Sequence, residues 1–199
     1  MPDPLLSRVP RSQMSERLQR DYDDARALRD DATLIEVGAN APELLEWYKD
    51  SFYGRLFYEG RVEVRIKELL RYRLSRTHGC AYCNRGNSKA ALRAGVSPEQ
   101  LDRIMTEDSP VFDDRDRAVL RLADRLSMGN QTGALDPELH RQLSRFFDDA
   151  QIFELGMVAG ILTGMAKFIF VYDLVEKEAH CPIPSHRAVA VPCEPAALR

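Results

Sequence analysis

The sequence predicts an all-α protein, a single-domain bundle of helices. Apolar side chains recur at the 3.6-residue helical spacing along most of the chain. A capping residue followed by proline opens two of these stretches, at Ser97-Pro98 and Asp136-Pro137. The chain has 199 residues, 44% hydrophobic and 30% charged, which is enough for one domain with a sizeable core.

Three helices are expected in the N-terminal part. Residues 1–14 are polar and proline-rich and predict an irregular arm, and residues 15–30 predict a charged, weakly amphipathic helix. A second helix over residues 42–57 has a broad apolar face and begins near Pro42. A third, over residues 62–77, has its aliphatic side chains on one arc and ends before His78-Gly79.

Five further helices follow. The first begins at Cys80 and ends near Ala94, with Gly95 as its C-terminal cap, and the second opens at Ser97 with a capping-box pattern. The complete set of expected bounds is 80–94, 98–105, 113–128, 136–146 and 149–176.

The last of these helices is unusually apolar. From residue 151 to 175 it is about long enough to cross a bilayer, but Glu154, Lys167 and Asp173 interrupt it. We therefore expect a core or subunit-interface helix and no membrane span. Gly156, Gly160 and Gly164 recur every four residues, a pattern typical of close packing within the subunit or between subunits.

The predicted domain organisation is an N-terminal arm and helix (residues 1–35), a helical domain (36–178) and a proline-containing C-terminal tail (179–199). The tail is expected to extend over a neighbour or to lack order. It contains Cys181 and Cys193, which are either ordinary tail cysteines or thiols that resolve a disulfide in trans.

Charge and cysteine content narrow the class of protein. A net charge of −3 gives no electrostatic footprint for nucleic acid. The N-terminus has no continuous apolar segment of the secretory type. Four cysteines are too few for a disulfide scaffold and fit a reducing compartment, so a cytoplasmic location is expected.

The candidate site is Cys80-Ala-Tyr-Cys83, on the first turn of a predicted helix. Helix N-terminal N–H groups stabilise a thiolate, which favours reversible disulfide chemistry. Two other interpretations are a pair of small buried side chains, and half of a metal site completed by Glu68, His78, His180 or Cys181. We predict no metal, because no second pair of ligands follows at the usual spacing.

Four neighbours are candidate helpers of the dithiol. Glu68 precedes Cys80 by twelve residues, His78 precedes it by two, Tyr82 stands between the cysteines, and Asn87 lies one turn after Cys83. Periodicity places Glu68 opposite the aliphatic arc of its helix and predicts a solvated carboxylate. His78 is expected at a helix end or in a loop.

These residues, together with Ala94-Gly95-Val96-Ser97, resemble the carboxymuconolactone decarboxylase and alkylhydroperoxidase (AhpD-like) superfamily. The resemblance implies that Glu68 is a proton-relay glutamate, Cys83 the peroxide-reactive thiol and Cys80 the resolving thiol. The relay histidine of the family is Asn87 here, and asparagine does not exchange a proton near neutral pH.

Some family members have a histidine between the two cysteines, where this chain has Tyr82. Tyrosine is a poor base at neutral pH because its pKa is near 10. His78, on the other side of the dithiol, is a candidate substitute for the missing relay histidine.

The resemblance implies an AhpD-like helical bundle, intertwined in a homo-oligomer, trimer or hexamer. It also implies thiol-dependent reduction of a hydroperoxide or disulfide exchange, without a cofactor. The expected reductant is a dithiol, either a lipoyl-bearing or a thioredoxin-like protein. The alternative is a catalytically weakened binding or assembly protein, because Asn87 replaces the relay histidine. Lactone decarboxylation is disfavoured, since decarboxylase members lack the CxxC pair.

Overall fold

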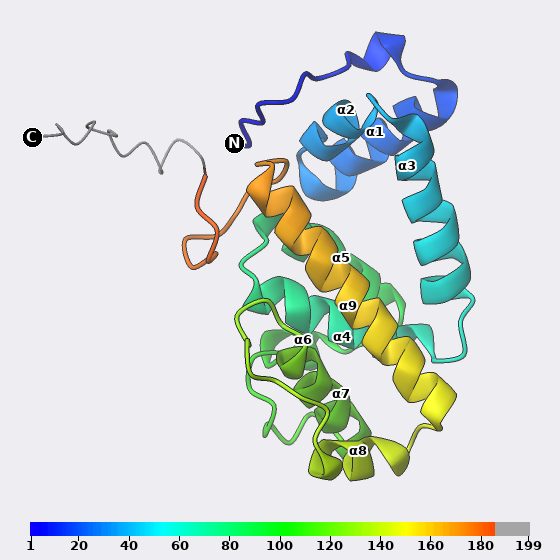
Figure 1. The fold of residues 1–199 in the computed structure, drawn as a ribbon, viewed down its shortest axis with the longest axis vertical. Helices are drawn as coiled ribbons and strands as arrows, with labels where there is room; N and C mark the ends of the chain where they lie inside the picture. Colours follow the sequence, from blue (N-terminus) through cyan, green and yellow to red (C-terminus); the bar gives the residue numbers. More distant parts are fainter. Residues whose placement is uncertain (186–199) are drawn as a thin grey trace, which may run out of the picture.

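The computed structural model describes residues 1–185 and contains helices but no strand in that range, so the all-α prediction is confirmed (Figure 1). The elements in chain order are a 3₁₀ turn (Arg11–Gln13), α1 (Glu16–Arg29), α2 (Thr33–Gly38), α3 (Pro42–Trp47), a π-helix (Tyr48–Tyr58), α4 (Val64–Thr77), α5 (Ala81–Arg93), α6 (Pro98–Asp102), α7 (Asp114–Arg125), α8 (Pro137–Ser144) and α9 (Asp149–Val171).

Helix α4 is the centre of the fold. Every residue from Ile66 to Ser75 is buried, because α5, α7 and α9 pack around it (Figure 1). The main core joins α4 and α9 with α7, α8 and the π-helix, through side chains such as Ile66, Leu70, Val119 and Leu155. Each such side chain stabilises the fold by roughly 1.5–3 kcal/mol relative to its exposed state.

Helix starts follow the capping signals in the sequence. Ser97 and Gln100 form the predicted capping box at α6, and Asp148 and Gln151 form another at α9. Asp136 accepts a hydrogen bond from the Leu139 N–H at the start of α8.

The N-terminal region differs from the prediction in two places. Residues 33–38 form α2, which the sequence analysis did not predict. The predicted helix over residues 42–57 is an α-helix only to Trp47 and a π-helix after it. Phe52 and Phe57 are five residues apart and would diverge by about 140° on an α-helix. The wider π-helix lets both rings enter the core.

Helix α9 ends at Val171, five residues earlier than predicted. The chain reverses at Asp173, whose φ is +54°. Residues 174–185, here called the C-terminal strap, then cross the start of α5: Glu178 N–H donates to Gly79 O (2.8 Å) and Tyr82 N–H donates to Glu176 O (3.3 Å). Within the predicted tail, His180 Nε2 lies 3.0 Å from the Arg76 carbonyl oxygen and Ser185 Oγ donates to Asp173 Oδ2 (2.7 Å), so its described part lies against its own chain. Cys193 lies outside the described residues.

The outer face of α9 is open. No described atom lies within 4 Å of a Cβ built at Gly156, Gly160 or Gly164, so the glycine row is not used for packing within residues 1–185. Phe153, on this helix, is 70% exposed. Subunit contact through this face remains a prediction. By length and composition alone, α9 is also the one described helix that would reach across a membrane, yet its opposite face lies in the main core.

Candidate active site

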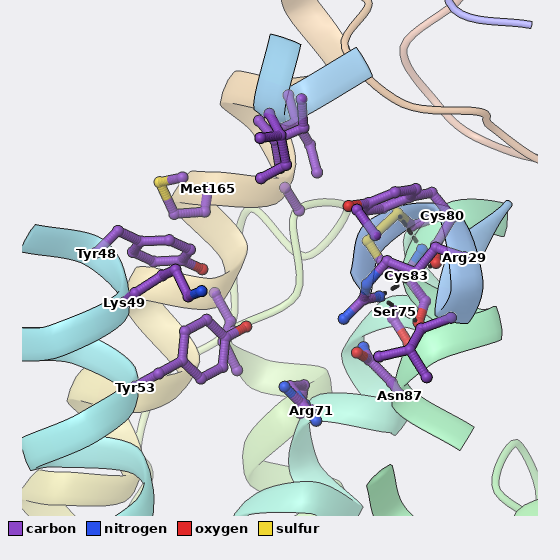
Figure 2. A pocket seen from close by; sticks show the side chains of 18 of the residues that line it. Arg29, Tyr48, Lys49, Tyr53, Arg71, Ser75, Cys80, Cys83, Asn87 and Met165 are labelled. Atoms are coloured by element: carbon purple, nitrogen blue, oxygen red, sulfur yellow. Dashed lines mark hydrogen bonds between the residues drawn. A yellow bond between two sulfur atoms is a disulfide. The ribbon is translucent and has the colours of Figure 1, made fainter. Parts of the chain in front are cut away.

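The two cysteines form a disulfide at the start of α5 (Figure 2). The connection from α4 requires Gly79, whose φ is +67°. A Cβ at Gly79 would also lie 2.9 Å from the backbone nitrogen of Cys181 in the strap. Cys80 is the N-cap of α5, and its sulfur accepts a hydrogen bond from Cys83 N–H (3.1 Å). This position stabilises negative charge on a reduced sulfur.

Both cysteines line a cavity of about 450 Å³ that lies between α1, α2, α3, the π-helix, α4, α5 and α9 (Figure 2). Cys80 is fully buried, whereas Cys83 is partly exposed. The volume is within the usual range of small-molecule pockets. Most of the wall is apolar, including Leu34, Ile35, Leu45, Leu74, Leu162, Met165, Ala166 and Ile169.

The polar wall of the pocket faces the disulfide from the π-helix and α4. Tyr48, Tyr53 and Arg71 project into the cavity there (Figure 2). Desolvation, with Tyr53 close by, raises the pKa of Tyr48 well above 10, so its phenol is neutral at physiological pH. The wall therefore offers hydroxyl groups and a guanidinium to a bound molecule.

Glu68 is buried, with 1% exposure, so the predicted solvated carboxylate is wrong. Periodicity failed here because α4 is surrounded on all sides. Glu68 accepts hydrogen bonds from Arg71 at Nε (2.9 Å) and Nη2 (2.7 Å). Burial raises the pKa of Glu68, and Arg71 limits the rise. Among the described residues Arg71 lines the pocket, and Glu68 is linked to the pocket through it.

His78 lines the pocket but holds a neighbouring segment in place. Its Nε2 accepts a hydrogen bond from Met128 N–H (3.0 Å), which assigns the ring proton to Nδ1. Burial lowers the pKa of His78 to about 4. A neutral ring with this low pKa is poorly suited to carry the proton that the family histidine would carry.

Tyr82 and Asn87 also line the pocket, and both are buried. Burial raises the pKa of Tyr82 to about 12, so it remains a phenol. Asn87, one turn after Cys83, carries an amide, which does not exchange a proton near neutral pH. The described residues contain no group of three or more His, Cys, Asp and Glu side chains placed to hold a metal ion.

The sequence profile of the carboxymuconolactone decarboxylase family matches residues 42–125, which span the π-helix, the CxxC and α7. This segment of the chain is therefore similar to the carboxymuconolactone decarboxylase family. The uncharacterised protein YnjA of Escherichia coli K12 is 27% identical over 124 residues, which make up 62% of this chain and 66% of YnjA. The match therefore leaves about a third of YnjA uncovered.

Solved structures with 19–21% sequence identity to this chain share the fold. One is a protein of unknown function from Agrobacterium tumefaciens, described as an antioxidant defence protein AhpD. It matches with a TM-score of 0.60 and 21% identity, and the match covers 68% of this chain and 91% of that one. The debrominase Bmp8 matches with a TM-score of 0.70 and 19% identity, and the match covers 89% of this chain and 94% of Bmp8. A cysteine-to-alanine variant of Bmp8 in complex with 2,3,4-tribromopyrrole matches with a TM-score of 0.66 and 19% identity, and the match covers 89% of this chain and 93% of that one.

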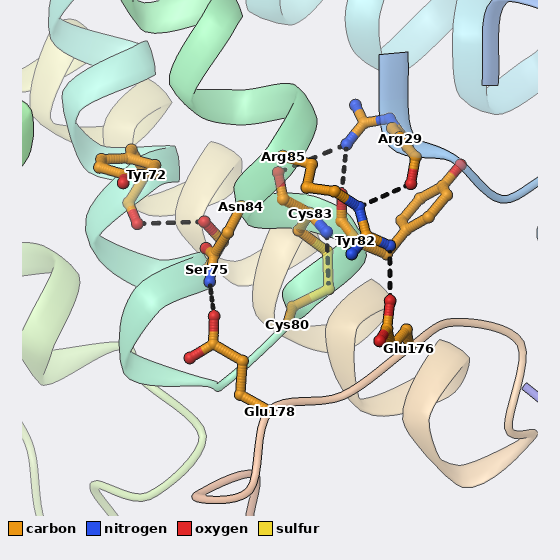
Figure 3. Close-up of a disulfide and its surroundings, with 10 residues drawn as sticks. All are labelled: Arg29, Tyr72, Ser75, Cys80, Tyr82, Cys83, Asn84, Arg85, Glu176 and Glu178. Carbon is orange, nitrogen blue, oxygen red and sulfur yellow. Dashed lines mark hydrogen bonds and ion pairs between the residues drawn. A yellow bond between two sulfur atoms is a disulfide. The ribbon is translucent and has the colours of Figure 1, made fainter. Parts of the chain in front are cut away.

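Arg29 is one of the pocket residues outside the segment that the family profile matches. Arg29 ends α1, and its Nη1 donates hydrogen bonds to the carbonyl oxygens of Tyr82 (3.2 Å) and Cys83 (3.4 Å) (Figure 3). Sequence reasoning missed Arg29. It ends a charged helix 54 residues before Cys83, and no local pattern sets it apart from the other arginines of that helix.

Proposed function

We propose that this protein is a thiol-dependent reductase in which Cys83 and Cys80 reduce an organic hydroperoxide held in the pocket. One observation carries the proposal: both sulfurs line an apolar cavity of about 450 Å³ at the N-terminus of a helix. Such a cavity suits an alkyl or aryl hydroperoxide better than hydrogen peroxide, since the apolar wall contributes binding free energy only to an apolar group.

The proposed reaction transfers two electrons from the dithiol to the peroxide. The Cys83 thiolate attacks one peroxide oxygen, an S–O bond forms, the O–O bond breaks, and the released alkoxide takes up a proton to leave as an alcohol. Cys80 then attacks the Cys83 sulfenic acid, which forms the disulfide and releases water. The sum is one hydroperoxide and two thiols converted to one alcohol, one water and one disulfide.

The burial of the two sulfurs supports this assignment of roles. Cys83 is the more exposed of the two, whereas Cys80 is buried and accepts a hydrogen bond from Cys83 N–H. That hydrogen bond favours a Cys80 thiolate, the form that attacks a sulfenic acid. Glu68 would adjust the charge of the pocket wall through Arg71.

A dithiol must then reduce the Cys80–Cys83 disulfide. The attack would fall on Cys83 sulfur, the more accessible one. A lipoyl-bearing or thioredoxin-like protein supplies the required two electrons. We also propose that the protein is a cytoplasmic homo-oligomer, trimer or hexamer, that uses the open face of α9 as a subunit contact.

The test is the consumption of cumene hydroperoxide by the reduced protein, with dihydrolipoamide as the reductant. Wild type should consume peroxide with turnover, and Cys83→Ser should not. Cys181→Ser is the matched control, because this cysteine lies outside the pocket. Equal rates for wild type and Cys83→Ser would refute the proposal.

A second candidate function is reductive dehalogenation, which the similarity to the debrominase Bmp8 over 89% of this chain favours. Here the Cys83 thiolate attacks the halogen, the carbon takes up a proton, and Cys80 displaces halide to form the disulfide. Reduced protein incubated with 2,3,4-tribromopyrrole would release one bromide per disulfide. Bromide release without peroxide consumption would replace the first proposal by this one.

The alternative of a weakened binding or assembly protein rests on Asn87. If the missing histidine limits the chemistry, Asn87→His should raise peroxidase activity well above that of a nearly inactive wild type. An unchanged rate would count against a lost relay as the cause.

A further inference from the structure

The guanidinium of Arg29 lies directly on the helix that carries Cys83. Besides its hydrogen bonds to the carbonyls of Tyr82 and Cys83, its Cζ lies 4.9 Å from the centroid of the Tyr82 ring (Figure 3). The backbone carbonyl of Arg29 accepts a hydrogen bond from Arg85 Nε (2.7 Å). The end of α1 is thus attached to the first two turns of α5.

Gly86 makes this contact possible. A Cβ at position 86 would lie 2.7 Å from Arg29 Nη2 and closer still to Nη1 and Cζ. The guanidinium therefore occupies the space that a side chain at position 86 would fill. Positions 83 and 86 are neighbours on one helix face, three residues apart. The positive charge consequently lies next to Cys83 on this face of α5, within 3.4 Å of its carbonyl oxygen.

Arg29 also keeps its charge unpaired. Within residues 1–185 no carboxylate lies within ion-pair distance of it, whereas the other two pocket cations are paired, Arg71 with Glu68 and Lys49 with Asp21. An unpaired charge in a largely apolar cavity acts on a neighbouring thiolate more strongly than one in bulk water.

The remaining titratable groups around the dithiol do not supply a free cation. Helix α9 contributes only apolar residues to the pocket, and the strap acids Glu176 and Glu178 are bonded to Arg85 and Asn84. The other charged or titratable pocket residues are Asp21 and Asp24 from α1, Tyr48, Lys49, Tyr53 and Tyr58 from the π-helix, Arg71 and His78 from α4 and its end, and Tyr82 from α5.

We infer that Arg29 stabilises the thiolate form of Cys83, and that α1 thereby supplies the charge that activates this thiol in a chain with Asn87 at the relay position. The inference rests on the proposed use of Cys83 as the attacking thiol. Arg29 acts through Cys83 and is a positioning residue. Gly86 is part of the same arrangement, since it leaves room for the guanidinium.

The test measures the pH dependence of Cys83 alkylation by iodoacetamide in the reduced full-length protein, with the Cys83 peptide quantified by mass spectrometry. Arg29→Met should raise the pKa of Cys83 and slow alkylation at pH 7 by roughly tenfold. Arg29→Lys should restore part of the rate. Gly86→Ala, which displaces the guanidinium but keeps its charge, should slow alkylation as well.

Arg26→Met is the matched control. Arg26 is exposed on the same helix and donates to the Asp30 carbonyl (2.9 Å), away from the pocket. It should leave the alkylation profile unchanged. If Arg29→Met does not fold, Arg29→Lys and Gly86→Ala carry the test.

An unchanged Cys83 profile in Arg29→Met or Gly86→Ala, even with a lower unfolding midpoint, would show a purely structural role and overturn the inference. Alkylation needs no substrate, so its outcome is separate from that of the proposed function. If the Cys83 profile shifts but the protein consumes neither cumene hydroperoxide nor 2,3,4-tribromopyrrole, the role of Arg29 is supported and both proposed reactions are refuted.

Discussion

Lys67 and Glu68 are consecutive residues of α4, both fully or almost fully buried, and each forms an ion pair, yet the two pairs differ in what they connect. Lys67 Nζ donates to Glu154 Oε1 (3.0 Å) and to the carbonyl of Leu56 (3.1 Å). Glu154 also accepts from the N–H groups of Arg61 (2.7 Å) and Val62 (3.1 Å). This pair joins α4, α9 and the loop after the π-helix.

The Glu68–Arg71 pair is local, because its members are three residues apart on one helix. Arg71 lies 4.9 Å from the centroid of the Phe57 ring and lines the pocket. Burial of an ion pair therefore does not by itself indicate its role. The first pair holds separate elements together, and the second sets the charge of the pocket wall. The two should respond differently to mutation.

The largest expected effect is the loss of stability in Glu154→Ala. The change leaves the Lys67 ammonium and two backbone N–H groups buried without their acceptor, which costs about 3–5 kcal/mol. Urea unfolding measures it. Glu138→Ala, whose side chain is exposed, is the control and should change stability by less than about 0.5 kcal/mol. A small effect of Glu154→Ala would break the distinction drawn between the two pairs.

The buried ring of His78 should make the stability of the folded protein fall at acidic pH. The unfolded chain protonates this ring near pH 6.5, whereas the folded protein does so only near pH 4. Below pH 6.5 the unfolded state therefore binds more protons, and stability falls as the pH drops toward 4, by roughly 2–3 kcal/mol. Urea unfolding at pH 7 and pH 4.5 should show a smaller fall in His78→Gln. The exposed His140→Gln should retain the wild-type fall, and identical curves for all three would contradict the assignment.

Glu68→Gln separates function from stability. Glutamine still accepts a hydrogen bond from Arg71, and the pair links no distant elements, so we expect a loss of about 1–2 kcal/mol. The pH profile of thiol oxidation should shift, because Arg71 at the pocket wall loses its counter-charge. Glu154→Gln, assayed as folded protein, is the matched control and should keep the wild-type profile. A shifted profile in Glu154→Gln together with a wild-type profile in Glu68→Gln would contradict the roles assigned to the two pairs.

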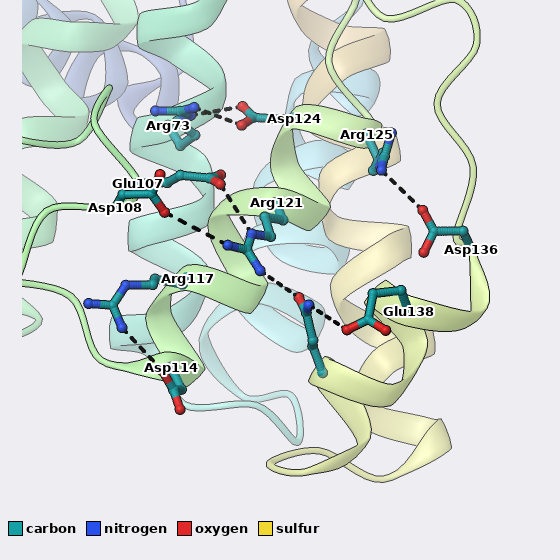
Figure 4. Close-up of polar contacts among 11 residues, drawn as sticks. Arg73, Glu107, Asp108, Asp114, Arg117, Arg121, Asp124, Arg125, Asp136 and Glu138 are labelled. Atoms are coloured by element: carbon teal, nitrogen blue, oxygen red, sulfur yellow. Dashed lines mark hydrogen bonds and ion pairs between the residues drawn. The ribbon is translucent and has the colours of Figure 1, made fainter.

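The smallest effect is expected at the surface. Arg125 pairs with Asp136 at 3.0 Å in an exposed network of charges between α7 and α8 (Figure 4). Exposed pairs of this kind contribute little, so Arg125→Ala should change the unfolding free energy by less than about 1 kcal/mol. A loss as large as that of Glu154→Ala would mean that exposure does not distinguish these ion pairs.

Local sequence signals predicted the fold class and several helix ends. The capping box at Ser97, the break at Gly79 and the all-α class follow from neighbouring residues. Helix periodicity identifies one buried face, and it therefore placed Glu68 in solvent although α4 is enclosed on every side. The π-helix depends on where Phe52 and Phe57 must pack, which the local sequence does not record.

The site was predictable only in part. Cys80 and Cys83 stand out through their spacing, and the resemblance to the superfamily added Glu68 and the departure at Asn87. Arg29 reaches the site through tertiary packing between α1 and α5, so no pattern within α1 indicates its role. The open glycine face of α9 likewise required the fold to show that no described segment covers it.

The most direct test of the central claim, that Cys83 is the thiol oxidised in the pocket, is to trap its oxidation product. Reduced wild type and Cys80→Ser are each treated with one equivalent of cumene hydroperoxide in the presence of dimedone, and the peptides are analysed by mass spectrometry. We expect a Cys80–Cys83 disulfide in wild type and a dimedone adduct on Cys83 in Cys80→Ser. Free thiols at both positions in wild type, or no adduct on Cys83 in the variant, would contradict it.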